Sequence, residues 1–457
     1  MPRAGVETDS AGNVYVAGDF FDSVQADQAG SSAGRLTSNG TNDVFVAKYN
    51  SSGDLLWATS FGSDGYDYAW GLALDDSDNV IVTGNFNGTV DFAPSMTDPL
   101  GLDTLTSAGG YDGFILKLDA NGEFQWVRQM MGDDFDRVFS VDVDRANDIY
   151  IGTQSYSSTV TYDGLPPQMG SGVRHAGLAK IDAGGTFQWA RSFHNDDVVP
   201  HVLPVVDDRA SDPADWTVKA VGEFTNQLTM DADVLVSRGD KDAFLVAVDA
   251  ATGQATLAAT SFGGPYIDRA LAIGIGASGE IYVSGYFQQQ TDFDLAASHA
   301  DGSDLRESSG PNDLFVLRLQ DDLSYDTVTT FGGSGFEGVP PNSLAVTPAG
   351  EVYVSGHFEA AMQFGDYALV SSGETTPMSS PLTLISTSVG PTVSEVAARP
   401  GVICWDLEIG TGLANWLAMR SIAPRASRST VRNLYVTGSF KQTADFSTGD
   451  RLTSNGD

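Results

Sequence analysis

A nine-residue motif recurs along the chain and constrains its fold more than any other feature. The first copy reads GNVYVAGDF at 12–20. Further copies read NVIVTGNF (79–86), VKAVGEF (218–224), EIYVSGYF (280–287), EVYVSGHF (351–358) and NLYVTGSF (433–440), with a weaker copy, DIYIGTQSY, at 148–156. With Gly18, Gly84, Thr153, Gly222, Gly285, Gly356 and Gly438 as anchors, successive copies are 66, 69, 69, 63, 71 and 82 residues apart. Seven copies at this spacing indicate a repeat architecture.

One repeat unit contains four short strands, named A to D here. In the second unit, strand A covers 71–75, strand B 80–84, strand C 113–118 and strand D 124–128. Turns rich in Asp, Asn and Gly join A to B and C to D, and a longer polar segment, 87–112, joins B to C. Because no stretch has a convincing helical pattern, each unit is predicted to form one antiparallel sheet.

A single four-stranded sheet would leave both faces in water, whereas sheets arranged around an axis bury both faces. We therefore predict an all-β, seven-bladed β-propeller of four-stranded antiparallel blades. Strand A should be innermost because its Gly, Ala and Leu residues are small, and Trp57, Trp126 and Trp189 of strand D should fill the wider gaps between blades. The predicted blades of this single domain cover about 4–62, 63–132, 133–194, 195–263, 264–332, 333–420 and 421–457.

Residues 377–432 break the repeat, because an unrelated sequence stands where strand C of the sixth blade should follow Gly373. Codons that encode 377–381 can give Asp-Val-Phe-Ala, a typical strand C, when they are read two bases later. The same offset turns 426–431 into Leu-Ala-Val-Asp-Gly, a typical strand A. We therefore predict a shifted reading frame, a poorly ordered segment and a disrupted sixth blade; the alternative is a genuine irregular insertion.

The two ends of the chain also depart from a complete ring. The sequence begins inside a strand A and stops before the strand C of the seventh blade, so we expect the last blade to be incomplete. Either the ring is open at this blade or the chain is part of a longer one. The N-terminus shows no apolar segment of the kind that directs secretion.

Composition excludes several classes of partner. With 24 Lys and Arg against 60 Asp and Glu, the net charge is −36, which argues against binding to nucleic acid or to an anionic membrane. The single cysteine, Cys404, excludes an internal disulfide framework. No run of about 18 apolar residues exists, so no membrane span is expected.

Three blocks resemble a known repeat family: LTSNGTNDVFVAKYNSSGDLLWATSFG (36–62), DGYDYAWGLALDDSDNVIVTG (64–84) and SGEIYVSGYF (278–287). They are similar to the bacterial β-propeller repeats called SBBP, and the resemblance extends over most of the chain. It implies a propeller fold and an extracellular or cell-surface location. It implies no particular reaction.

An acidic residue precedes strand A in most units, and these residues are the candidate site: Asp67, Asp136, Asp197, Asp268 and Glu337. The D-to-A and B-to-C loops emerge on the same face of a propeller, called the loop face below, so these carboxylates could surround the channel. Carboxylate oxygens suit Ca²⁺, which is the one cofactor that we consider. The alternative is that they hold turns by accepting hydrogen bonds from backbone amides.

Other candidates carry weaker signals. A second set of acids precedes strand C, and its regular spacing indicates turn support: Asp43, Asp112, Asp242 and Asp313. The segments LDANGE and YNSSGD resemble pieces of calcium loops but are interpreted as C-to-D hairpin turns. His194 and His201 are the weak candidates for a Zn²⁺ site.

The sequence therefore favours a non-catalytic, secreted or cell-surface propeller that acts as a binding or scaffold module. The partner would be an extracellular protein or glycan, and the chain a monomer or part of a larger one. One alternative is an extracellular lyase or hydrolase acting on glycan through Arg174, His175, His194 and His201. The other alternative is a calcium-dependent adhesion module.

Overall fold

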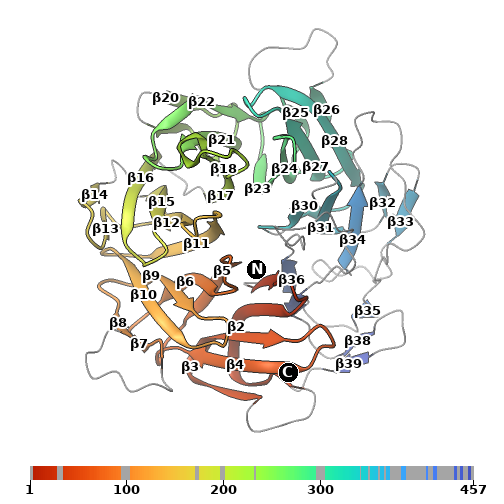
Figure 1. Ribbon diagram of the computed structural model, residues 1–457. Coiled ribbons are helices and arrows are strands. Elements are labelled where there is room, and N and C mark those ends of the chain that lie inside the picture. Colours follow the sequence, from red (N-terminus) through yellow and green to blue (C-terminus); the bar gives the residue numbers. More distant parts are fainter. Residues whose placement is uncertain are drawn as a thin grey trace.

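The chain is all-β in the part that the structure, a computed structural model, describes (Figure 1). This part comprises residues 4–27, 34–93, 103–169, 174–195, 201–230, 233–294, 304–339, 341–347, 350–358, 361–364, 367–370, 382–387, 408–409, 415–418, 437–439, 443–445 and 451–453. Its strands are antiparallel, and its one helical element is a 3₁₀ turn, η1 (Pro213–Asp215). Within these residues, no helix has the length and apolar character needed to cross a membrane.

Five of the sheets contain four strands in the spatial order A, B, C, D, as the sequence predicts. They are β1 (Ala4–Thr8), β2 (Val14–Gln25), β3 (Arg35–Tyr49) and β4 (Leu55–Phe61) in blade 1; β5 (Tyr68–Leu74), β6 (Val80–Phe86), β9 (Asp112–Leu118) and β10 (Phe124–Met131) in blade 2; β11 (Asp136–Val143), β12 (Ile149–Ser155), β15 (Arg174–Ile181) and β16 (Phe187–Asn195) in blade 3; β17 (Val202–Asp207), β18 (Thr217–Phe224), β21 (Asp242–Asp249) and β22 (Ala255–Phe262) in blade 4; and β23 (Arg269–Ile275), β24 (Ile281–Phe287), β27 (Asp313–Leu319) and β28 (Tyr325–Gly333) in blade 5. The recurring motif forms strand B of each blade.

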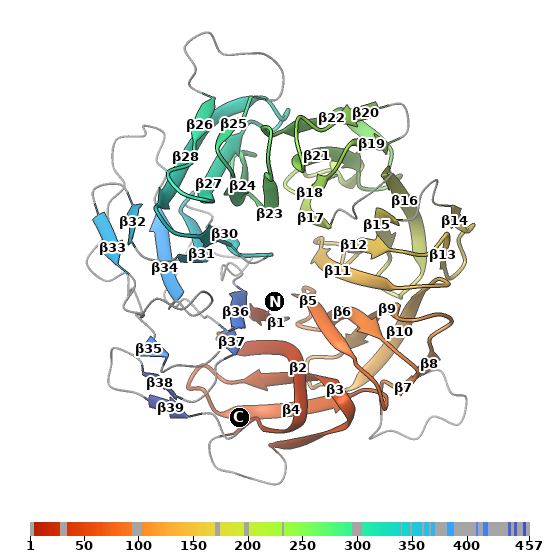
Figure 2. The same ribbon diagram turned by 180° about the vertical axis from the view of Figure 1, so that it is seen from behind.

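The blades lie radially about one axis, which Figures 1 and 2 show from opposite sides. Residues from six sheets line a single central cavity, so their inner strands meet at a common centre. Strand A is innermost, as predicted, and its small residues are required there. A Cβ added to Gly71 would lie 2.5 Å from Thr83 Oγ1 and 3.1 Å from Val141 of the next blade. The propeller fold is therefore confirmed.

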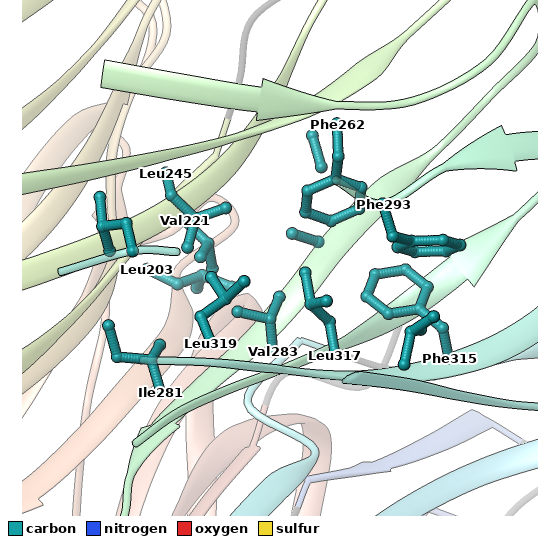
Figure 3. Packing of buried hydrophobic residues seen from close by; sticks show 14 of the residues in the cluster. Leu203, Val221, Leu245, Phe262, Ile281, Val283, Phe293, Phe315, Leu317 and Leu319 are labelled. Atoms are coloured by element: carbon teal, nitrogen blue, oxygen red, sulfur yellow. The ribbon is translucent and has the colours of Figure 1, made fainter. Parts of the chain in front are cut away.

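Apolar side chains fill the space between neighbouring blades. Between blades 4 and 5, the cluster includes Leu203, Val221 and Leu245 from one blade and Ile281 and Val283 from the other (Figure 3). All five side chains are fully buried. Burying a side chain of this size contributes roughly 1.5–3 kcal/mol, so each blade depends on its neighbours for stability.

The tryptophans of strand D join blades 1, 2 and 3 each to the next blade, as predicted. Trp57 Nε1 donates a hydrogen bond to the Ala120 carbonyl at 3.2 Å, and its ring covers Gly122, which has a φ of +84°. Trp126 and Trp189 repeat this contact with the next C-to-D turns. The glycine is needed because its φ is positive and because the indole ring occupies the space where a Cβ would lie.

The B-to-C segments form hairpins, whereas the sequence predicts only polar loops there. They are β7 (Thr89–Asp91) with β8 (Thr104–Thr106), β13 (Thr159–Tyr162) with β14 (Gln168–Met169), β19 (Gln227–Met230) with β20 (Asp233–Val236), β25 (Gln290–Asp292) with β26 (Leu305–Glu307), and β32 (Ala361–Phe364) with β33 (Tyr367–Val370). β13, β19 and β32 pair with strand D of the preceding blade. The physical reason is that strand D would otherwise expose unpaired backbone groups at a sheet edge.

The sixth sheet is built around β31 (Val352–Phe358). This strand pairs with β29 (Glu337–Gly338) and β30 (Leu344–Val346) on one side and with β34 (Leu382–Thr387) on the other. β34 thus takes the place of strand C within 377–432. Apart from β34, β35 (Glu408–Ile409) and β36 (Asn415–Ala418), residues 377–432 lie outside the described residues. The shifted reading frame stays a prediction.

Short strands follow between the sixth sheet and the first. β36 pairs with β37 (Thr437–Ser439), and both strands contact β1. β38 (Thr443–Asp445) pairs with β35 and with β39 (Arg451–Thr453), as a B-to-C hairpin of a further blade would. These pairs agree with an incomplete last blade, but the count of seven stays a prediction.

Candidate functional site

The acids that precede strand A are buried. Asp67 accepts hydrogen bonds from the Ser63 amide (2.6 Å) and the Asn87 amide (3.1 Å), and Asp268 accepts from the Gly264 amide at 2.7 Å. Burial raises the pKa of Asp67 to about 6 and that of Asp268 to about 6. Both side chains therefore tie the D-to-A loop together and leave little surface for a ligand.

The other members of this set differ in what the structure describes. Asp136 accepts hydrogen bonds from Ser155 Oγ and, at 2.7 Å, from Ser157 Oγ, and burial raises its pKa to about 7. Glu337 is also fully buried, and Asp197 lies outside the described residues. The calcium-binding ring of carboxylates stays a prediction, and the contacts of the described members are those of residues that support loops.

The second set of acids supports turns, as predicted. The carboxylate of each member accepts a hydrogen bond at 2.9–3.0 Å from a backbone amide four residues earlier; the four are Asp43, Asp112, Asp242 and Asp313. The structure also brings the two sets together at the blade junctions. Burial is the main cause of the raised pKa values of Asp67 and Asp136. The charge of Asp43 raises the pKa of Asp67 further, and the charge of Asp112 raises that of Asp136 further.

The candidate histidines form no metal site in the described residues, where no group of three or more His, Cys, Asp or Glu is placed to hold an ion. His194 lies in β16 and pairs through its backbone with His175 of β15, while Arg174 pairs with Asn195. The side chains of these four residues lie outside the description. His201 is buried beside blade 5, so the glycan-cleaving alternative gains no shared pocket from the residues whose side chains are described.

A row of aromatic rings crosses the loop face of blades 2 and 3. Tyr66 stacks on Tyr68 with ring centroids 6.1 Å apart, and Tyr68 stacks on Tyr111 at 6.4 Å. Phe135 follows, 4.9 Å from Tyr111, and then Tyr156 at 5.7 Å. Tyr66 is 44% exposed and the other four rings are half-buried. We call these five residues the aromatic row.

Arg137 connects the aromatic row to the inner end of the blades. Its guanidinium lies 5.1 Å from the centroid of Phe135, 5.0 Å from that of Trp70 and 5.7 Å from that of Phe139. Trp70 and Phe139 sit at β-bulges of β5 and β11, and their rings stack at 5.0 Å. The bulges change the direction in which both side chains point, because one extra residue in the strand rotates the local backbone.

A group of polar and charged residues continues from Phe139 into blades 4 and 5. The ring of His201 stacks on Phe139 with centroids 4.7 Å apart, and its Nε2 lies 2.8 Å from Arg269 Nη2. Arg269 also binds Glu223 through two nitrogens, and Lys241 Nζ donates to Glu223 Oε1 at 3.0 Å. We call His201, Glu223, Lys241 and Arg269 the charged group.

The charged group fixes its own protonation states. Burial and the neighbouring cations lower the pKa of His201 to about 3, so its imidazole is neutral. Although burial opposes the charge of Glu223, Arg269, His201 and Lys241 lower its pKa to about 2. The carboxylate in turn raises the pKa of Arg269 despite its burial. At neutral pH the group therefore holds two cations and one anion.

The sequence analysis missed the charged group, although one signal could have found it. In the recurring motif, the residue between the conserved Gly and Phe changes from copy to copy: Asp19, Asn85, Glu223, Tyr286 and His357. In the structure, three of these residues meet a strand A side chain on the loop face: Asn85, Glu223 and Tyr286. Asn85 Oδ1 accepts from Trp70 Nε1 at 2.6 Å, and the Tyr286 hydroxyl accepts from Arg269 Nη1 at 3.3 Å.

The opposite face of the ring has a different chemistry. A central cavity of about 550 Å³ opens among the ends of strand A and the A-to-B turns. Its lining includes the carboxylates of Glu7, Asp9, Asp75, Asp78 and Asp142. Lys48 pairs with Asp9 at 3.5 Å and Lys117 with Asp75 at 2.8 Å, and both lysines also bind the next blade. Five carboxylates thus line the cavity on this face, while the aromatic row and the charged group lie on the loop face.

Comparison with known proteins agrees with a repeat fold and shows no function. No family model matches the chain. It is 29% identical over 178 residues to an uncharacterized WD repeat-containing protein of Acanthamoeba polyphaga mimivirus; the match covers 34% of this chain and only 13% of that relative. A solved structure, a member of the DUF4221 family from Bacteroides vulgatus, aligns over 78% of this chain and 93% of its own, with 10% identity and a TM-score of 0.27.

Proposed function

We propose that this propeller is a non-catalytic module that binds an extracellular glycan on its loop face. The observation that supports the proposal is the aromatic row, in which five rings of blades 2 and 3 follow one another in contact. Aromatic rings combine a flat apolar face with, in tyrosine, a polar tip, and this combination suits the apolar faces and hydroxyl groups of sugar rings. The stacked rings lose little freedom on binding, because their neighbours already hold them.

The surrounding architecture supports a binding role. Five neighbouring sheets of at least four strands each, together with the tryptophan contacts between blades 1 to 4, make a rigid frame, and loops on a rigid frame commonly carry ligand contacts. The extracellular or cell-surface location and the relation to SBBP repeats rest on the sequence resemblance, and we propose them on that basis.

A glycan array probed with the whole chain tests this proposal. We expect binding to a subset of glycans, and we expect Tyr66→Ala and Tyr111→Ala to abolish it while melting temperatures stay close to that of the parent. Leu56→Ala is the matched control, because Leu56 is an exposed apolar residue on the outer strand β4. Binding that survives both tyrosine changes, or no binding to any glycan, would refute the proposal.

A further inference from the structure

The charge of the loop-face centre is opposite to that of the whole chain. The chain carries a net charge of −36, yet Arg137, Lys241 and Arg269 all act on His201, and each of them disfavours a proton on its ring. Glu223 is the acid inside this arrangement, and it pairs with two of the three cations. Counting these four ionised residues, the centre has a net charge of about +2.

The acids beside the two arginines offset little of this charge, whereas the exposed Asp240 beside Lys241 offsets part of it. Asp136 and Asp268 directly precede the two arginines, but both carboxylates are buried; Asp136 accepts a hydrogen bond from Ser157 Oγ and Asp268 accepts one from the Gly264 amide. Their raised pKa values, about 7 and about 6, mean that each binds a proton for part of the time near neutral pH. Around His201, three cations therefore act together with one ionised acid, Glu223.

We propose that the glycan bound on the loop face carries an anionic group, a carboxylate or a sulfate, which Arg137 and Lys241 bind beside the aromatic row. This inference rests on the proposed function. Arg137 is half-buried and lies against the Phe135 ring, so an anion bound there would adjoin a sugar stacked on the row. Lys241 is 23% exposed, and a lysine ammonium has further N–H donors besides the one that binds Glu223.

Arg269 is a positioning residue in this arrangement. Its guanidinium is held by Glu223, Tyr286 and His201 and is only 15% exposed. It keeps Glu223 ionised and oriented, and Glu223 in turn holds the Lys241 ammonium. The anion is thus expected to contact Arg137 and Lys241, while the buried pair fixes their surroundings.

Calorimetric titration of the whole chain tests the inference with four oligosaccharide probes of equal length: a neutral hexose oligomer, a hexuronate oligomer, its methyl ester and a sulfated oligomer. We expect the uronate or the sulfated probe to bind at least about tenfold more tightly than the ester and the neutral oligomer, since one charge-assisted hydrogen bond supplies that difference. The advantage should shrink in about 0.5 M NaCl.

Variants identify the cations. Arg137→Gln and Lys241→Gln should each weaken the anionic probe about tenfold and leave the neutral probe unchanged. Arg145→Gln is the control, because Arg145 binds Asp208 and Trp216 near the opposite face. Equal affinity for acid and ester, with binding still lost in Tyr66→Ala, would overturn this inference and keep the proposed function. No binding of any probe would overturn both.

Discussion

Substituting one glycine in a C-to-D turn tests how the blades are joined. Gly122 has a φ of +84°, and a Cβ there would lie 2.8 Å from Cε3 of Trp57 in the preceding blade. Carbon atoms in contact normally lie about 3.5–4.0 Å apart, so the indole ring must move and its hydrogen bond to Ala120 is strained. We expect Gly122→Ala to cost about 1–2 kcal/mol for the left-handed backbone and a further 1–3 kcal/mol for the overlap.

Gly53 separates these two costs. It occupies the same turn position in blade 1, its φ is +86°, and no atom lies within 4 Å of its added Cβ. Gly53→Ala should therefore cost only the backbone part, about 1–2 kcal/mol. Urea unfolding measures both variants. Equal losses in the two would refute the reasoning, because they would show that the Trp57 ring yields without cost; a larger loss in Gly122→Ala supports it.

Three further substitutions and one addition test other parts of the structure. The pKa of Asp242, raised by burial to about 7, means that stability falls as pH rises from about 4 to 7, and Asp242→Asn should flatten this part of a melting profile. Glu223→Gln should cost about 3–5 kcal/mol, because it leaves Arg269 and Lys241 without their anion. Leu323→Gly should destabilise the chain by about 1–3 kcal/mol, since lost burial outweighs the relief of a positive φ. Neither Ca²⁺ nor a chelator should change the melting temperature.

Each of these expectations has a contrary result. If the melting temperature of Asp242→Asn still falls with pH as in the parent, other titratable groups cause this dependence. The cost of Glu223→Gln should vanish only as pH falls through about 2, where the folded carboxyl gains its proton; a cost that vanishes at pH 4 would contradict the pairing. A more stable Leu323→Gly variant would show that strain exceeds packing. A rise in melting temperature with Ca²⁺ would support the hypothesis that the ring of carboxylates binds calcium.

The repeat predicted the fold because the same physical demands recur in every blade. Gly5 and Gly71 occupy the same position in blades 1 and 2 and have no room for a side chain near the axis, so their identity is visible in the sequence. Trp57 and Gly122 are likewise linked by a contact that repeats, and where blade 4 has Leu257 instead of Trp, the next turn has Leu323 instead of Gly. Sequence could also predict the buried acids as turn residues, because Asp43 recurs at a fixed distance from its strand.

The hairpins and the candidate site could not be predicted in the same way. The pairing of β13 with β10 joins segments of different repeats, and short polar strands carry little periodicity of their own. The aromatic row combines Tyr68, Tyr111 and Phe135 from three different positions in two repeats, so no single copy reveals it. Only the packing of blade 2 against blade 3 brings these positions together.

In the recurring motif, two residues are required by packing, and the residue between them varies and determines the binding chemistry. Its Gly and Phe are fixed by packing: a Cβ at Gly222 would lie 2.1 Å from the His201 carbonyl, and Phe224 is fully buried. The residue between them lies at the loop-face end of strand B and differs from copy to copy, while the order of the four strands stays the same. At this position in blade 4 stands Glu223, which pairs with Lys241 of its own blade and with Arg269 of blade 5. The charged group therefore forms at the variable position of the motif, where two neighbouring blades supply cations for one carboxylate. Sequences of the same frame with different residues at this position are therefore expected to bind different ligands.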